Sequence, residues 1–453
     1  MTTIQQINHL SWRAGFGFHP SAWEKVQSRS LEDAVKYLFR GQKNTVTLLT
    51  NQTSTRQSAI HDSSEEDQNE ARMLEKQSVM QQNAQWIARM ADPSEDTFLE
   101  RMTLFWHGHF ACRITLGDLA TAQLNTFRQH ALGNFKDLVL AVAKDVAMIR
   151  YLNNQQNKKR SPNENFAREL MELFTIGREN YSEQDIKEAA RAFTGWSSNL
   201  EGKFVFRPYE HDYGSKTFMG KKGDFDGGDI IDIILAREET ALFLVTKIYR
   251  YFVNETIDEM MVKTLAKQFY QSNYNIAQLM RTIFESDWFY APKNIGTKIK
   301  SPVELIAGVM RTLEVEFSSP FPLIRIQKTL GQTLFDPPNV AGWKGGNAWI
   351  DNATLMIRLN LANGFIALSE KRNTKQEDQE TQELMDEAQA SKIARLGNVK
   401  LNFQPLLQTL ENQDKDTIFE TLSHFLLQPQ LRWNKKTLSH TFQIPVMKTI
   451  SRP

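Results

Sequence analysis

Apolar residues recur at three- and four-residue intervals along most of this 453-residue chain. That spacing places them on one side of an α-helix, whereas a half-buried strand needs strict alternation. Strand-like patterns are short and are confined to residues 203–206 and 45–49. The sequence therefore predicts an all-α fold, a multi-helical globular domain with at most a small β-hairpin near residues 203–218.

The predicted helices cover residues 20–40, 70–92, 95–112, 118–131, 134–152, 162–176, 183–194, 229–236, 238–252, 257–271, 275–286, 302–315 and 352–369. We expect a main helical domain over residues 1–369. Residues 370–391 are rich in Glu, Gln, Lys and Asp and predict a charged linker or a solvated helix. The apolar pattern returns after that stretch and predicts a small helical C-terminal appendage over residues 392–453.

Composition narrows the class of protein. The chain has 54 basic and 53 acidic residues, so its overall charge gives no reason to expect a nucleic-acid partner. Cys112 is the single cysteine, which excludes an intramolecular disulfide and a cysteine-based metal cage. No apolar run is long enough for a membrane span, and the first residues lack the pattern of a signal peptide. We expect a soluble cytoplasmic protein; an exported form whose leader has been removed would have the same features.

The segment 161–177 has the signals of one complete helix. Ser161 and Glu164 have the spacing of a capping box, and Gly177 is a typical stop. Glu164, Arg168 and Glu172 are four residues apart and form a charged stripe along the helix, and Glu169 lies near the edge of that stripe. Apolar residues spread widely around the same helix and leave little room for a fully wet face. The charged residues therefore form either a buried salt-bridge network or a ligand or catalytic site.

Two further segments carry candidate residues. On the next predicted helix, which Ser182 and Asp185 cap, Arg191 is placed to reach a carboxylate on a neighbouring helix. A glycine-punctuated loop then combines the pair His211 and Asp212 with Lys216. An adjacent histidine and aspartate can form a metal pair or a base with its orienting acid, although neighbouring side chains often point apart.

Histidines and tryptophans supply the remaining candidates. His107 and His109 lie about 200° apart on a helix, because each residue turns by about 100°, so we do not expect them to chelate one ion together. His107 is still a candidate to line a site. Trp343 and Trp349, in a turn-rich loop, either stack on a planar ligand or plug the core between helices, and Trp196 is a candidate aromatic wall.

Seven stretches occur together and in order: residues 9–17 (HLSWRAGFG), 101–110 (RMTLFWHGHF), 163–170 (NENFAREL), 189–196 (AARAFTGW), 211–216 (HDYGSK), 300–304 (KSPVE) and 337–343 (PPNVAGW). In these stretches the chain resembles a large bacterial family catalogued as domain of unknown function 1800. The resemblance implies a mostly helical fold and no settled activity. Members are often encoded beside a sulfatase-like family, domain of unknown function 1501, which suggests a sulfatase-like partner and shared work on envelope or extracellular polymers.

The chain departs from the family pattern in two respects. Many members look exported, whereas this chain shows no leader. Many also have histidine where this chain has Phe174, in the pattern Glu-Leu-His-Thr-Leu-Gly, and this departure argues against a histidine-rich metal site.

We expect the charged candidates to converge on one pocket, with Trp196 and Trp343 as aromatic walls: Glu164, Arg168, Glu169, Glu172, Arg191, His107, His211, Asp212 and Lys216. One hypothesis is a hydrolase or transferase that acts on a polar polymer such as a glycan. A glutamate would serve as general acid or base, Arg168 or Arg191 would hold an anionic group, and His211 would move protons. The alternative is a non-catalytic binding or assembly protein in which the charges form a structural network. A third, weaker hypothesis is a divalent metal held by His211, Asp212 and a glutamate.

Overall fold

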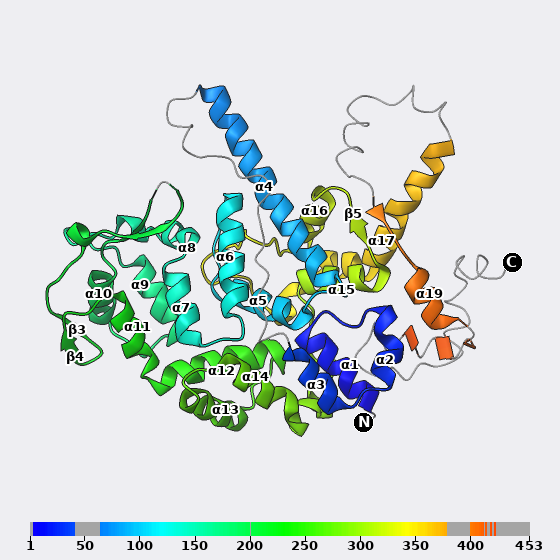
Figure 1. Cartoon of the computed structure of the whole chain (residues 1–453), viewed down its shortest axis with the longest axis horizontal. Coiled ribbons are helices and arrows are strands. Elements are labelled where there is room, and N and C mark those ends of the chain that lie inside the picture. Colours follow the sequence, from blue (N-terminus) through cyan, green and yellow to red (C-terminus); the bar gives the residue numbers. More distant parts are fainter. Residues whose placement is uncertain are drawn as a thin grey trace.

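The structure is a computed structural model that describes residues 3–40, 64–199, 201–377 and 399–411, together with residues 413–414, 417–418 and 421–422. Helices dominate this part of the chain, and the strands form three two-stranded antiparallel sheets (Figure 1). The predicted all-α class is therefore confirmed. The predicted strand over residues 45–49 lies outside the described residues.

The first half of the chain forms helices α1 (Thr3–Ala14), α2 (Trp23–Gln27), α3 (Leu31–Leu38), α4 (Glu65–Ala91), α5 (Thr97–His109), α6 (Gly117–His130), α7 (Phe135–Ala143), α8 (Val146–Tyr151), α9 (Asn165–Glu169), a π-helix (Leu170–Thr175), α10 (Glu183–Ala192) and α11 (Gly227–Leu235). The second half forms α12 (Glu238–Phe252), α13 (Glu259–Gln271), α14 (Ile276–Glu285), α15 (Pro302–Leu313), α16 (Phe321–Leu330), α17 (Asn352–Glu377) and α19 (Gln404–Leu410). Short 3₁₀ turns occupy Pro20–Ala22, Asn154–Gln156, Pro208–Glu210, Asp287–Tyr290, Pro292–Asn294 and Gly346–Trp349.

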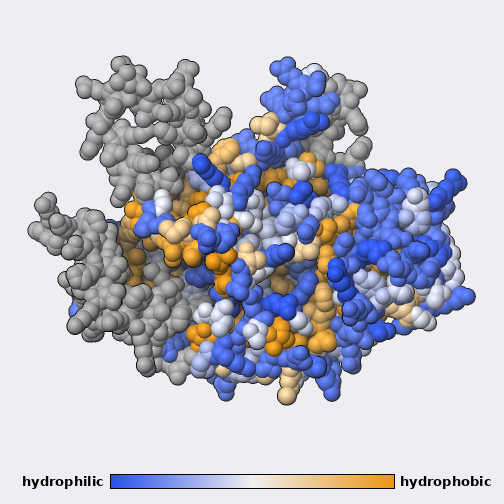
Figure 2. All heavy atoms as spheres, turned by 180° about the vertical axis from the view of Figure 1, so that it is seen from behind, coloured by the Kyte–Doolittle hydropathy of each residue, from blue (hydrophilic) through white to orange (hydrophobic). Residues whose placement is uncertain are grey.

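Two of the sheets are hairpins that lie between α10 and α11. Strand β1 (Trp196–Ser198) pairs with β2 (Phe204–Phe206), and β3 (Lys216–Phe218) pairs with β4 (Lys221–Gly223). Together with α8 to α11 they make up what we call the hairpin lobe, on the left of Figure 1. Seen from behind, on the right of Figure 2, the surface of this lobe is mostly hydrophilic. The structure therefore has two hairpins in the region where the sequence predicted one.

Helix α5 lies at the centre of the packing. It contacts α1, α4 and α6, and residues on every side of it are buried, among them Phe98, Met102 and Trp106. A helix that is surrounded in this way contributes to the core all round rather than along one stripe. α4 packs against α15, α16 and α6, and α12 packs against α13. The polar residues of α5 are consequently buried as well and must find partners inside the protein.

Several predicted helices are divided into shorter elements in the structure. The predicted helix 134–152 is interrupted at Asp145, whose side chain accepts the backbone N–H of Met148 and so begins α8. The predicted helix 20–40 is likewise divided into a 3₁₀ turn, α2 and α3. Helices α1 and α16 were not predicted.

The capping box proposed for Ser161 and Glu164 is wrong. The helix begins only at Asn165, and Glu164 stands at its N-cap without a side-chain hydrogen bond, whereas Ser161 exchanges backbone hydrogen bonds with Lys158. Ser182 and Asp185 do form the predicted capping box.

The predicted division of the C-terminal part into a charged linker and a helical appendage stays a prediction, because the structure describes few residues after Glu377. Helix α17 continues without a break to Glu377, across the predicted boundary at residue 369. Residues 378–398, which hold most of the predicted linker, lie outside the described residues. Strand β6 (Val399–Lys400) pairs with β5 (Glu316–Phe317), and α19 contacts the 3₁₀ turn Pro20–Ala22. Within the described residues, none of the helices combines the length and the apolar character that a membrane crossing requires.

Candidate functional site

The charged stripe of α9 is engaged in ion pairs at the surface of the hairpin lobe. The Arg168 guanidinium donates to both Glu183 carboxylate oxygens at 2.9 Å and to Glu164 Oε2 at 3.2 Å. The Glu183 side chain is 71% exposed, so water screens this pair. The hydrogen bond to Glu183 is the main reason why the pKa of Arg168 is raised. Arg168 therefore links α9 to the start of α10.

Glu172 and Glu169 lie beside this group. Glu172 accepts from Arg178 Nε at 2.7 Å and from the Tyr181 hydroxyl at 3.2 Å. Glu169 is half-buried, and burial together with the charge of Glu172 raises its pKa. The environment of Glu169 therefore favours its protonated form.

A second polar group joins α10 to the loop before β3. Arg191 Nε donates to Asp212 Oδ2 at 2.7 Å, and Arg191 Nη1 donates to Glu188 Oε2 at 2.9 Å. The hydrogen bond from Arg191 is the main reason why the pKa of Asp212 is lowered. The buried Lys216 ammonium donates to the backbone oxygens of Asp212 and Gly214 at 2.6 and 3.1 Å. These contacts fix the shape of the loop.

His211 does not share partners with the Asp212 carboxylate. Its Nδ1 donates to the backbone oxygen of Thr194 at 2.8 Å. Trp196 is buried and packs against Phe193 and Phe204. Within the described part of the chain, no group of three or more His, Cys, Asp or Glu side chains could hold a metal ion.

His107 lies on the buried helix α5, away from the hairpin lobe. Its Nε2 accepts the backbone N–H of Phe335 at 3.2 Å, and its ring stacks on Trp343 with centroids 5.6 Å apart. Burial lowers the pKa of His107 to about 3, so the ring is neutral. Phe335 has a φ of 65°, which is strained for a residue other than glycine. His107 therefore helps to hold a strained loop residue in place.

His109 serves a different element. Its Nε2 donates to the Phe174 carbonyl at 2.9 Å, and Lys247 Nζ donates to the Leu173 carbonyl at 2.7 Å. These carbonyls end the π-helix and have no partner within it. Burial lowers the pKa of Lys247 to about 8. The Phe174 ring lies against His109, with ring centroids 6.2 Å apart.

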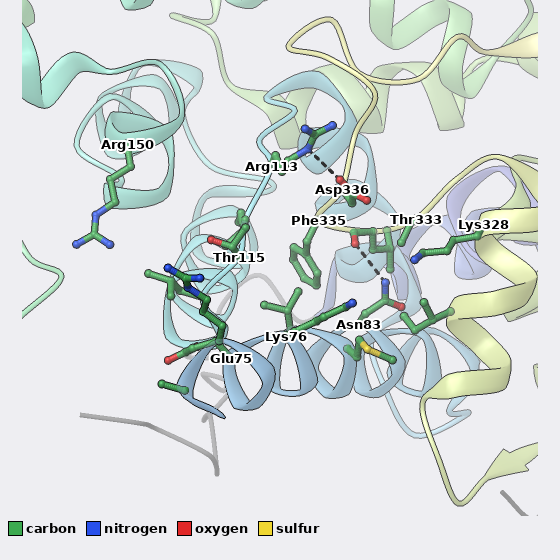
Figure 3. Close-up of a pocket in the computed structure, with 18 of the residues that line it drawn as sticks. Glu75, Lys76, Asn83, Arg113, Thr115, Arg150, Lys328, Thr333, Phe335 and Asp336 are labelled. Atoms are coloured by element: carbon green, nitrogen blue, oxygen red, sulfur yellow. Dashed lines mark hydrogen bonds and ion pairs between the residues drawn. The ribbon is translucent and has the colours of Figure 1, made fainter. Parts of the chain in front are cut away.

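Most of the predicted site residues therefore lie in ion-paired or hydrogen-bonded groups on the hairpin lobe, whereas His107 stacks on the partly buried Trp343 away from them. None of the predicted site residues lines the cleft beside α4 described next or the smaller cavity at the start of α15 described below. One open cleft beside α4 occupies about 790 Å³. Helix α4 forms one wall of this cleft, and the segment 333–336 forms the opposite wall (Figure 3).

The floor and the rim of this cleft, which we call the α4 cleft, differ in chemistry. The apolar lining comes from Ala71, Val79, Met80, Ile114, Leu116, Ile324, Leu334 and Phe335. The cationic lining comes from Arg72, Lys76, Arg113, Arg150 and Lys328, against two acidic residues, Glu75 and Asp336. Figure 3 shows the labelled cations spread from Arg150 at one end to Lys328 at the other.

Both acidic residues of the α4 cleft are already engaged. Asp336 Oδ1 pairs with Arg113 Nε at 2.9 Å, and Glu75 Oε2 accepts the backbone N–H of Gly117 at 3.0 Å. The side chains of Lys76, Arg150 and Lys328, by contrast, make no hydrogen bond or ion pair with the described residues. The cleft therefore presents uncompensated positive charge above an apolar floor.

A residue of α16, Gln327, ties the wall opposite α4 to α4 itself. Gln327 Oε1 accepts from Asn83 Nδ2 at 3.1 Å and from the backbone N–H of Leu334 at 3.1 Å. His107 supports Phe335, the next residue of the same wall. His107 does not line the cleft, but it holds the lining residue Phe335 in place through this hydrogen bond.

Sequence reasoning missed the α4 cleft, because the apolar and charged residues of α4 follow no single stripe. The usable signals were the two cations Arg72 and Lys76, four residues apart on one predicted helix, and Arg113 just after the stretch 101–110. Comparison with known proteins gives a family but no activity. A family model described as a protein of unknown function (DUF1800) matches residues 9–445. No curated protein and no solved structure matches the chain.

Proposed function

The chain belongs to the DUF1800 family, whose description assigns no activity, and from the geometry we propose a non-catalytic binding or assembly protein. In this proposal the α4 cleft holds an acidic, partly apolar segment of a partner protein. The observation that carries the proposal is the excess of five cations over two carboxylates around an apolar floor. Such a cleft attracts negative charge and also rewards the burial of apolar side chains.

The distribution of charge favours a segment over a ligand with a single acidic head. The cations lie at both ends of the cleft and between them, so an occupant with acidic groups at intervals satisfies more of them (Figure 3). The apolar floor favours a peptide over a glycan, because sugar hydroxyls placed there would lose hydrogen bonds to water. The volume of about 790 Å³ suits a short stretch of peptide.

The hydrolase or transferase hypothesis, with a polar polymer such as a glycan as substrate, rests on Glu169. Burial and the neighbouring Glu172 raise the pKa of Glu169, as expected for a general acid. The Glu169→Gln variant separates the two proposals. A binding protein tolerates this change, so the variant should complement a strain that lacks the protein, and loss of complementation with unchanged melting temperature would favour the enzyme.

The test measures the binding of a fluorescein-labelled peptide, about twelve residues of repeating Glu-Glu-Leu, to the protein by fluorescence anisotropy. The triple variant Lys76→Glu, Arg150→Glu and Lys328→Glu should weaken binding by at least about tenfold. A tenfold change in Kd corresponds to about 1.4 kcal/mol of binding free energy, which three charge reversals together can supply. The matched control reverses the exposed Lys222, Lys263 and Lys267, which lie outside the cleft.

Binding should also weaken as salt concentration rises, because exposed charges are screened. Two results would contradict the proposal. One is an equal loss of affinity in the control triple variant. The other is tighter binding of an oligogalacturonate of similar charge than of the peptide, which would point to an acidic glycan.

A further inference from the structure

A second, smaller cavity lies at the start of α15, apart from the α4 cleft. Trp12, Gly15 and Phe16 line it from the N-terminal segment, and Arg101 lines it from α5. The remaining lining residues precede or begin α15: Lys298, Lys300 and Glu304. Three stretches that carry the family resemblance, residues 9–17, 101–110 and 300–304, therefore meet here although they are distant in sequence.

Glu304 is the carboxylate at the centre of this group. Its Oε1 accepts from Arg101 Nη2 at 2.7 Å and from Lys298 Nζ at 2.8 Å, and its Oε2 accepts the backbone N–H of Ser301 at 2.9 Å. Burial alone raises the pKa of Glu304, but Arg101 and Lys298 outweigh it and bring the pKa to about 2. Glu304 is thus ionised, and both of its oxygens accept hydrogen bonds.

The cations outnumber this carboxylate. Lys300 makes no ion pair with the described residues, and its Nζ lies 3.2 Å from the centroid of the Trp12 ring. Arg13 is fully buried, and Arg358 donates to the Lys300 carbonyl at 2.9 Å. Three basic side chains, Arg101, Lys298 and Lys300, therefore line the cavity against one acid, Glu304. Arg13 and Arg358 lie within electrostatic range of the same carboxylate but do not line the cavity.

Several N–H groups of these cations are also left without acceptors. Arg13 Nη2 donates to the Asn294 carbonyl at 2.7 Å, but Arg13 Nε and Nη1 are buried without a hydrogen-bond partner among the described residues. The same holds for Arg101 Nε and for Arg358 Nε and Nη2. Buried donors of charged groups without acceptors are costly. Arg101 is the residue of this group that lines the cavity, so its Nε, beside Lys300, which is unpaired among the described residues, calls for a further acceptor with negative charge there.

We propose that this cavity, here called the Glu304 cavity, binds one small monovalent inorganic anion of about the size of chloride. The free volume of about 10 Å³ suits a single particle of roughly water size and excludes a larger ligand such as a nucleotide. Aromatic side chains and Gly15 form the rest of the wall and limit access of water. The anion supplies the negative charge that Glu304 alone does not.

Loss of protons from the two lysines is the competing way to reduce the charge. Burial lowers the pKa of Lys298 and of Lys300 to about 7 each. The aromatic faces beneath them favour the charged form, since Lys298 Nζ lies 3.7 Å from the centroid of the Tyr251 ring. A bound anion keeps both lysines protonated at pH 7, and this difference makes the two explanations separable.

The test uses the full chain at constant ionic strength, with sodium chloride replaced stepwise by sodium gluconate. The melting temperature should rise with chloride concentration, because a ligand that binds only the folded state stabilises it. The ³⁵Cl NMR linewidth should broaden in the presence of the protein, and bromide should compete. Lys300→Met and Lys298→Met should each reduce the broadening, whereas Lys328→Met, in the α4 cleft, should not.

Wild-type measurements decide the question even if the lysine variants fold poorly. A melting temperature and a ³⁵Cl linewidth that are both indifferent to chloride would overturn the proposal. So would ¹³C NMR of labelled lysine that shows Lys298 and Lys300 both neutral at pH 7 in saturating chloride. Equal broadening in Lys328→Met and Lys300→Met would place the anion elsewhere and would also refute it.

Discussion

Replacement of Glu304 by glutamine removes one negative charge from a buried cluster and preserves the shape of the side chain. The amide oxygen can still accept the Ser301 N–H, but the charge-assisted hydrogen bonds from Arg101 and Lys298 are lost. Folding lowers the pKa of Glu304 from 4.5 to about 2. That difference corresponds to about 3 kcal/mol of stability, which agrees with the about 3–5 kcal/mol lost when one partner of a buried pair is removed.

The sign of the pH dependence follows from the same pKa. A carboxyl whose pKa is lowered by folding stabilises the protein above its unfolded pKa and loses that effect as pH falls. The wild-type protein should therefore lose about 3 kcal/mol between pH 4.5 and pH 2 from this group, and Glu304→Gln should lack that part of the acid limb.

The assay is equilibrium urea unfolding at pH 7 in fixed sodium chloride, with tryptophan fluorescence as the signal. Glu239→Gln is the matched control, because its partner Arg237 is exposed and the pair is screened. A decrease of less than about 1 kcal/mol for Glu304→Gln, the range of a surface ion pair, would refute the reasoning from burial.

Three further changes test other parts of the structure. Folding raises the pKa of the buried Asp145 from 3.8 to about 6, so stability from this group falls as pH rises from 4 to 6; Asp145→Asn should remove this slope, worth about 3 kcal/mol, in urea titrations across that range. Gly177→Ala should cost about 1–3 kcal/mol, because φ is +80° and the new Cβ would lie 2.7 Å from Phe243; Gly331→Ala, with a φ of +88° and open space, should cost less in the same thermal melts. Arg168→Ala should leave the urea midpoint nearly unchanged, since its ion pairs are exposed, and a large decrease would show that they are structural.

The helical class could be predicted from local chemistry, because the signals lie within a few residues of each other. The apolar spacing of residues 238–252 predicted α12 with the ends that the structure has, and Ser182 and Asp185 marked the start of α10. The same logic failed at Ser161, where the backbone pairs with Lys158 instead of entering a helix. It also missed α1, whose buried polar residues Asn8, His9 and Arg13 hide its apolar stripe.

The candidate sites could not be predicted in the same way, because their residues come from segments that are far apart in the chain. The sequence placed His107 on a helix but did not reveal that it supports Phe335, 228 positions later. It grouped the charges of residues 164–172 with His211 and Lys216, whereas the structure pairs each with its own neighbours. The α4 cleft and the Glu304 cavity were not anticipated.

The amino-acid order alone determined the helical class and most of the helices, since helix signals lie between residues close in sequence, and its ordered motifs identified the family. Tertiary packing alone decided which charges became buried, which were paired at the surface and where positive charge accumulated. Arg101 is the clearest example. From the sequence it is an ordinary basic residue of a predicted helix, whereas in the structure it is almost fully buried and pairs with Glu304. The physical reason is that the free energy of a charge depends on its desolvation and on its neighbours in space, which no local pattern records.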